Sequence, residues 1–328
     1  MKKKKVVVIG GGTGTSVVLQ GLKKYPVDLS AIITTADDGS SSGVLRKEFD
    51  MVPPGDIRQC LVALAAKDFG YLNERFQKGF LQGHTLGNLL ITLFSQHNKD
   101  FQQAIDELLL LVGAEGSLIP MTLRPVTLSA HLTNGKILVG ESRITRSRDI
   151  HKKLKKLSLS PKTAHANPRA VQVLLEADAI IVGPGNLYAS IIPVLLLPEI
   201  THAMRIAYGK KIYVANLFTQ SGHTPGFGVK DYLHVLERYM GGDVFTHIIY
   251  NTKRLPVSFI NQHRNDIVGE EISISSQTRA DARMVGRSLA SSFPKKGLSM
   301  NDPLHIMRNP FLHDPVKLAK ALMKILHS

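Results

Sequence analysis

The stretch that decides the fold is KVVVIGGGTGTSVVLQGL, residues 5–22. Its first part, Lys5–Ile9, has the continuous β-branched pattern of a strand that is buried on both faces. A glycine-rich loop follows, then a helix predicted from about Thr15 to Lys24 and a second strand over Leu29–Thr35. The sequence therefore predicts a βαβ unit whose first loop lies at a helix N-terminus, where free amides and the helix dipole favour an anion.

Four more polar loops follow short β-branched runs, and they comprise residues 37–42, 183–186, 216–224 and 250–253. If these runs are parallel strands, all five loops meet at one sheet edge, where open α/β sheets bind ligands. The loops offer glycine amides, hydroxyls and carboxamides but almost no cations. This chemistry suits a phosphorylated, sugar-like ligand.

Residues 43–116 differ from the rest, because helical patterns dominate there. Helices are predicted over Asp56–Ala66, Tyr71–Phe80, Thr85–Gln96 and Phe101–Val112. We interpret this part as a helical insertion after the second strand, within a single domain that spans residues 1–328.

After the insertion, Asn134-Gly135 separates two extended runs, Leu123–Leu132 and Lys136–Ser142, which predicts a β-hairpin. Alternating strands and helices follow: strands over Ala179–Val182, Ile212–Asn216 and Phe245–Tyr250, and helices near Pro168–Glu176, Tyr188–Leu196, Val229–Met240 and Pro315–Leu326. The predicted fold class is α/β, a Rossmann-like three-layer sandwich with a mostly parallel sheet, the helical insertion and the hairpin.

Composition narrows the class of protein. The 328-residue chain has one cysteine, Cys60, which excludes an internal disulfide and a multi-cysteine zinc site. Its longest apolar stretches, Leu108–Val112 and Ile191–Leu197, are too short for a membrane span, so a cytoplasmic location is expected.

The net charge of +15 is concentrated in one basic run. Nine Lys or Arg residues stand against one acid in Arg143–Arg169, and this run is either a solvated face or a surface for an acidic protein partner. Because the run lacks aromatic residues for base stacking, specific nucleic-acid binding is not expected. The sequence leaves self-association into a homo-oligomer open.

The glycine loop matches neither common nucleotide motif. With Gly10 and Gly12 as the first two glycines of a dinucleotide fingerprint, Thr15 stands at the third position, and no Lys-Ser or Lys-Thr pair completes a Walker A loop. A cradle of backbone amides for a phosphate or diphosphate remains, with a purely structural tight turn as the alternative.

Asp37 and Asp38 are adjacent carboxylates that cannot point the same way from a strand end. One is expected to face the crevice, where it accepts sugar hydroxyls or holds Mg²⁺, the one candidate cofactor, and the other to cap the next segment. We assign the crevice role to Asp38, next to Gly39. Helix capping by both carboxylates is the alternative.

Neutral polar groups complete the candidate site. His84 and Asn88 lie four residues apart near a predicted helix start, and His223 lies in a polar loop; each histidine is either a ligand-binding or a structural group. Three groups with donors and acceptors are suited to contact a base or a sugar: Asn186, Asn216 and Thr219.

Six motifs in this order resemble the CofD-like superfamily, and more closely its YvcK branch, the gluconeogenesis factors. They are Gly11–Gly14, Asp37–Ser40, Pro54–Arg58, Gly83–Asn88, Gly183–Tyr188 and Asn216–Gln220. The superfamily's enzyme branch transfers a phospholactyl group from a nucleotide diphosphate carrier with Mg²⁺. The resemblance to the YvcK branch implies instead a cytoplasmic regulator of growth and cell shape on gluconeogenic carbon sources, which binds UDP-sugars such as UDP-N-acetylglucosamine.

The chain departs from the transferase pattern at one motif. Where that branch reads Asn-Thr-Gly-Asp-Asp, this chain has Thr34-Thr35-Ala36-Asp37-Asp38. We therefore expect a UDP-sugar-binding regulator with no assigned catalytic residue; a Mg²⁺-dependent transferase of the 2-phospho-L-lactate type is the alternative. The expected ligand-binding residues are Gly11, Gly12, Thr13, Gly14, Asp37, Asp38, Ser40, Ser41, His84, Asn88, Gly185, Asn186, Leu187, Asn216, Thr219, Gln220 and His223.

Overall fold

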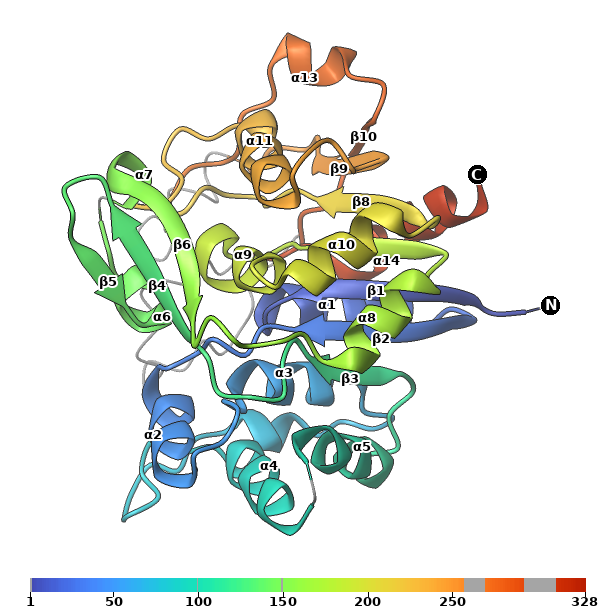
Figure 1. The fold of residues 1–328 in the computed structure, drawn as a ribbon. Helices are drawn as coiled ribbons and strands as arrows, with labels where there is room; N and C mark the ends of the chain where they lie inside the picture. Colours follow the sequence, from blue (N-terminus) through green and yellow to red (C-terminus); the bar gives the residue numbers. More distant parts are fainter. Residues whose placement is uncertain (1, 99, 149, 257–268, 292–310) are drawn as a thin grey trace.

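The computed structural model describes residues 2–98, 100–148, 150–256, 269–291 and 311–328. Its centre is a seven-stranded sheet in the order β10-β9-β8-β7-β1-β2-β3, with every neighbouring pair parallel (Figure 1). The strands are β1 (Lys4–Gly10), β2 (Val27–Ile33), β3 (Ser117–Pro120), β7 (Ala179–Val182), β8 (Lys210–Val214), β9 (His247–Asn251) and β10 (Met284–Arg287). The predicted α/β class with a mostly parallel sheet is confirmed.

Helices cover both faces of this sheet, which explains the uninterrupted apolar run of β1. Val6 and Val8 belong to one buried cluster, whereas Val7 and Ile9 belong to the other. The first cluster packs against α1 (Thr13–Leu22), α3 (Gly55–Leu64), α5 (Phe101–Leu111) and α14 (Pro315–His327). The second packs against α8 (Pro168–Leu175), η2 (Leu187–Ile191), α9 (Ile192–Leu195), α10 (Pro198–Ile206) and α11 (Val229–Met240). Because both faces of the strand are buried, apolar side chains do not alternate with polar ones along it.

A second, antiparallel sheet has the order β5-β4-β6. Its strands β4 (Thr127–Leu132) and β5 (Ile137–Val139) form the predicted hairpin, with Gly135 at φ +82° in the turn. The third strand, β6 (Leu154–Ser160), lies within the basic run and follows α7 (Ile150–Lys153). The expectation of a solvated face does not hold for the whole of β6, because Leu157 and Leu159 are buried in the core while Lys155 and Lys156 stay exposed.

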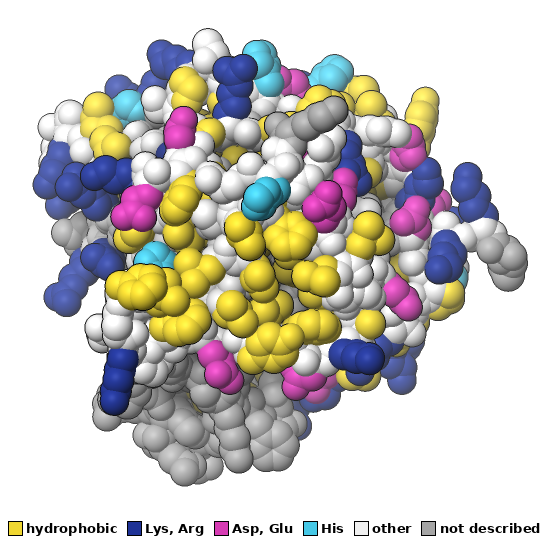
Figure 2. All heavy atoms as spheres, turned by 90° about the horizontal axis from the view of Figure 1, so that it is seen from below, with side chains coloured by type: hydrophobic (Ala, Val, Ile, Leu, Met, Phe, Trp, Pro, Cys, Tyr) yellow, Lys and Arg dark blue, Asp and Glu magenta, His cyan; other side chains and the backbone are white. Residues whose placement is uncertain are grey.

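Between β2 and β3 the chain forms α2 (Ser40–Phe49), α3, α4 (Leu86–His97), α5 and a 3₁₀ turn, η1 (Gly70–Asn73). The prediction of a helix over Tyr71–Phe80 is wrong. Gly79 and Gly83 have φ of +74° and +84°, and the amide of Phe76 donates to the carbonyl of His84, so the chain turns back on itself. Figure 2, which views the side where α2, α4 and α5 lie, shows hydrophobic side chains gathered on this face; Leu93 and Leu110 are among the exposed ones.

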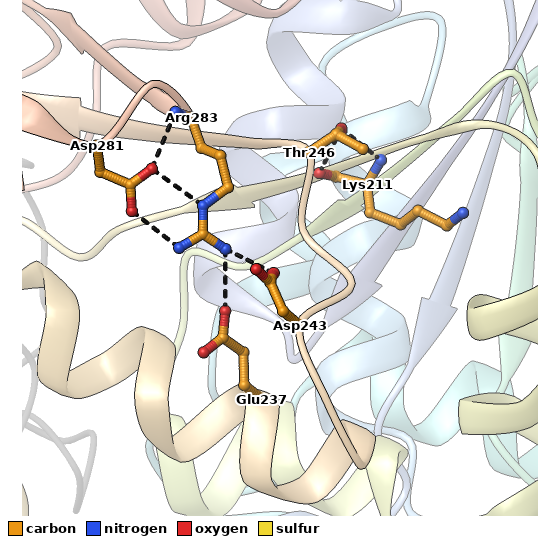
Figure 3. Close-up of polar contacts among 6 residues, drawn as sticks. All are labelled: Lys211, Glu237, Asp243, Thr246, Asp281 and Arg283. Carbon is orange, nitrogen blue, oxygen red and sulfur yellow. Dashed lines mark hydrogen bonds and ion pairs between the residues drawn. The ribbon is translucent and has the colours of Figure 1, made fainter.

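Arg283 ties the β10 edge of the sheet to the end of α11 (Figure 3). Its guanidinium donates twice to the Asp281 carboxylate, at 3.0 and 2.8 Å, and also to Glu237 and Asp243. The Arg283 hydrogen bond and nearby charge lower the pKa of Asp281 to about 2. Between β8 and the residue before β9, the Thr246 hydroxyl accepts from the Lys211 amide and donates to the Lys211 carbonyl.

By length and composition, no single helix in the described ranges could span a membrane; Leu187–Leu195 and Pro198–Ile206 pass that test only together, as a pair bent by 77°.

Candidate functional site

A cleft of about 270 Å³ lies beyond the ends of β1, β2, β7 and β8. The strand order reverses between β1 and β7, and such a switch point is where open α/β sheets bind ligands. Most of the residues that the sequence nominated line this cleft: Gly11, Gly12, Thr13, Gly14, Asp37, Ser40, Ser41, Asn88, Gly185, Asn186, Asn216, Thr219 and Gln220. Asp38, His84, Leu187 and His223 are not part of its lining.

The glycine loop packs too closely against its neighbours to carry side chains. A Cβ atom on Gly14 would lie 1.9 Å from the carbonyl oxygen of Pro184, in the loop after β7. A Cβ atom on Gly12 would lie 2.6 Å from the Asp56 carboxylate and from the Gln59 amide. The glycines thus let the start of α1 approach the β7 loop and α3, and they leave backbone amides at the cleft wall.

Two kinds of group on the cleft lining favour an anion. The first turns of α1, α2 and α3 contribute lining residues, and helix N-termini carry unpaired amides and the positive end of the dipole. Two arginines also line the cleft: Arg58 is buried and donates to the Thr85 hydroxyl at 2.7 Å, and Arg75 donates to the Gly83 carbonyl at 2.6 Å. The loops do lack cations, but the helical segment between β2 and β3 supplies them.

Ser41 and Asn88 form a buried polar pair on the cleft wall. The Asn88 amide nitrogen donates to the Ser41 hydroxyl at 2.9 Å, and the ring of His84 contacts the same hydroxyl at 3.0 Å from behind the lining. The Asn88 side-chain oxygen is buried and has no hydrogen-bond partner within the described residues. A buried acceptor without a partner is costly, so its place on a cleft wall points to a ligand donor.

The two adjacent aspartates have separate positions. Asp38 accepts the amide of Ser142 at 2.8 Å and so anchors the start of α6 (Glu141–Thr145), away from the cleft lining. Asp37 lines the cleft and accepts the Gly39 amide at 2.9 Å. Of the two, only Asp37 lines the cleft, so our assignment of the crevice role to Asp38 is wrong. Asp38 also does not cap the segment that follows it, α2, because its carboxylate binds the start of α6 instead.

Acidic groups occupy one side of the cleft. Asp37, Asp56 and Glu141 line it, and burial together with the nearby Asp37 charge raises the pKa of Glu141 to about 8. The Thr145 hydroxyl donates to the Glu141 carboxyl group. Glu141 is therefore largely neutral at pH 7 and can both donate and accept. Among the residues that the structure describes, no group of three His, Cys, Asp or Glu side chains is arranged to hold a metal ion.

Several nominated side chains are engaged within the protein. The Asn216 amide accepts from the Gly185 amide and donates to its carbonyl, and the Asn186 side-chain oxygen caps η2. The Thr219 hydroxyl accepts the Glu270 amide at 2.9 Å. His223 is buried and bonds the Ile144 carbonyl, and burial lowers its pKa; Leu187 packs in the core.

The sequence reasoning did not nominate some lining residues. Asp56 and Arg58 belong to a motif that it quoted, so their signal was available. Glu141 follows the hairpin but belongs to no sequence motif, so the sequence did not mark it as a site residue. Phe311 and His313 enter the cleft from the end of the chain through tertiary pairing, which no local pattern reveals.

The comparisons with known proteins agree with this geometry. A family model described as "2-phospho-L-lactate transferase CofD" matches residues 6–291. The gluconeogenesis factor of Halalkalibacterium halodurans is 41% identical over 254 residues, which cover 76% of this chain and 78% of that protein. The gluconeogenesis factor of Bacillus subtilis is 39% identical over 259 residues, which cover 78% and 81%. A crystal structure of a UPF0052 family member from Bacillus halodurans, 32% identical, superposes with a TM-score of 0.87 over 98% of this chain and 99% of that one. The chain belongs to the CofD family and, within it, to the gluconeogenesis factors of the YvcK type.

Proposed function

We propose that this protein is a cytoplasmic regulator that binds a UDP-sugar in the cleft and thereby controls growth and cell shape under gluconeogenic conditions. One observation carries the proposal: the same cleft wall holds the glycine amides at the start of α1, the buried Arg58, and the unpartnered oxygen of Asn88. The first two suit a diphosphate, and the third suits a donor such as a sugar hydroxyl.

Different parts of the ligand contact different residues of the cleft. The diphosphate binds the amides of Gly11–Gly14, with Arg58 and Arg75 compensating its charge. Sugar hydroxyls donate to Asn88 and to the Asp37 carboxylate, which accept without needing a metal. One bound ligand contacts α1, α3 and α4 at the same time and therefore stabilises this edge of the sheet. A partner protein can sense ligand occupancy through that change in stability.

A thermal-shift and calorimetry panel tests this function. We expect the protein to bind UDP-N-acetylglucosamine and UDP more tightly than uridine, with little change in EDTA. Arg75→Gln should reduce affinity for UDP about tenfold and leave uridine binding unchanged, because it removes a charge-assisted contact to phosphate. Arg124→Gln, an exposed arginine outside the lining, is the matched control. Equal affinity of the parent for UDP and uridine would refute a diphosphate cradle.

The second candidate function is a Mg²⁺-dependent transferase, and the acids on the cleft wall favour it. Asp37 and Asp56 fit the donor class of Mg²⁺, which proteins hold by one or two carboxylates together with substrate phosphates. The ion, when bound, would stabilise charge on a phosphoryl group that is transferred. If the protein is a transferase, Asp37→Asn should abolish turnover of the nucleotide substrate. If it is a regulator, the unsubstituted protein should already leave the UDP-sugar intact.

A further inference from the structure

One end of the cleft has a composition unlike the diphosphate cradle. Phe218, Phe311 and His313 line it, and the two phenyl rings lie 5.8 Å apart between centroids. The segment of Phe311 and His313 is held in place by backbone pairing: the Ser291 amide donates to the Leu312 carbonyl at 3.0 Å, and the Asp314 amide donates to the Leu289 carbonyl at 2.7 Å. This end therefore combines two largely buried phenyl rings with one imidazole ring.

The His313 ring is neutral and is an acceptor. Burial lowers its pKa to about 4, so at pH 7 the ring carries a single N–H. The ring hydrogen-bonds the backbone of Ala215, whose amide is already committed to the Ile249 carbonyl, so the ring donates its N–H to the Ala215 carbonyl. The nitrogen left over carries a lone pair.

That nitrogen, Nε2, is buried and has no hydrogen-bond partner in the described part of the chain. His313 as a whole is only 4% exposed, so bulk water does not compensate the missing bond. Two neighbouring neutral groups are used within the protein, since Asn216 bonds Gly185 and the Thr219 hydroxyl accepts from Glu270. The Nε2 atom of His313 is thus a buried acceptor on the cleft lining that no described residue satisfies.

We propose that Phe218, Phe311 and His313 form a nucleobase subsite, in which the free ring nitrogen of His313 accepts a hydrogen bond from the ring N–H of a uracil-type base. The inference rests on the proposed function, because it assigns the base of the nucleotide that the cleft binds. Uracil presents N3–H between two carbonyls, whereas adenine presents an acceptor, N1, at the corresponding edge and would face lone pair against lone pair. The phenyl rings supply the apolar contact on which a base packs.

The test compares UDP with N3-methyl-UDP, which lacks the donor, by calorimetry on the full chain. We expect the parent to bind N3-methyl-UDP at least tenfold more weakly than UDP. His313→Phe keeps a buried aromatic ring without nitrogens and should bind the two nucleotides within about twofold of each other. His202→Phe, an exposed histidine on α10, should keep the parent's preference.

The outcomes separate this proposal from the proposed function. Equal binding of UDP and N3-methyl-UDP by the parent overturns the subsite but leaves the cleft a nucleotide site, and this comparison needs no variant to fold. Full discrimination retained in His313→Phe also overturns it. Failure of the parent to bind any uridine nucleotide overturns both the subsite and the proposed function.

Discussion

Asn88→Leu separates a ligand-binding role from a structural one more sharply than other changes in the cleft. In the protein without ligand, the substitution removes one hydrogen bond, from Asn88 to Ser41 at 2.9 Å, and also removes a buried oxygen that has no partner within the described residues. A net hydrogen bond is worth about 1 kcal/mol and an unsatisfied buried acceptor costs about 1–3 kcal/mol. The two effects oppose each other, so the free energy of unfolding should change by less than about 1.5 kcal/mol.

Binding should respond quite differently. If a ligand hydroxyl donates to the Asn88 oxygen, its loss should weaken UDP-sugar binding by about 1–3 kcal/mol, which is roughly 5- to 150-fold in Kd. Calorimetric titration gives the affinity, and urea denaturation monitored by circular dichroism gives the stability. Asn98→Leu, at the far end of the same helix, is the matched control, because its amide bonds Phe94 and Glu107 and not the cleft. A large loss of stability with unchanged affinity would refute the argument and make Asn88 a structural residue.

Three further predictions follow from individual contacts. Gly14→Ala should lower the yield of folded protein or the melting temperature, because its Cβ atom would meet the Pro184 carbonyl oxygen at 1.9 Å; a native melting curve would contradict this. Since the pKa of Glu141 is raised to about 8, diphosphate affinity should fall severalfold as pH rises through 8, and Glu141→Gln should abolish that fall in titrations between pH 6.5 and 9. Asp281→Asn should cost roughly 1–2 kcal/mol of unfolding free energy at pH 7, and the difference from the parent should shrink as pH falls from about 4 to 2. The sign follows because the pKa of Asp281 is lower in the folded protein than in the unfolded one: the stabilisation is complete above the unfolded-state pKa and is lost as pH falls through about 2. Glu48→Gln, at an exposed residue, is the control and should show no such change.

The sequence predicted those parts of the fold that local pattern determines. The run Val6–Ile9 is apolar at every position because both sheet faces are covered, and that condition can be read from the residues themselves. Asn134-Gly135 likewise fixes the hairpin through the φ +82° of its glycine. By contrast, Tyr71–Phe80 has apolar residues at helical spacing, but Gly79 and the backbone bonds of Phe76 with Gly83 and His84 turn the chain back. These contacts override the local pattern.

The residues of the candidate site likewise divide into those that a local pattern predicts and those that it does not. Four of the five predicted loops line the cleft, because parallel strands bring their ends to one edge. The fifth, residues 250–253 at the end of β9, does not. Arg58 belongs to a motif that the sequence shows, so it could have been nominated. His313 reaches the cleft through a bridge to Ala290, and spacing along the chain does not reveal that pairing. The choice between Asp37 and Asp38 depended on where α6 begins, and only the packed structure places its amide next to Asp38.

The most direct test of the central claim is a calorimetric titration of the purified protein with UDP-N-acetylglucosamine in EDTA, followed by phosphorus NMR of the recovered nucleotide. The account predicts saturable binding near one ligand per chain, weaker binding of an ADP-sugar, and recovery of an unchanged UDP-sugar with or without Mg²⁺. No binding of the UDP-sugar, or its conversion to another phosphate species when Mg²⁺ is added, would contradict it.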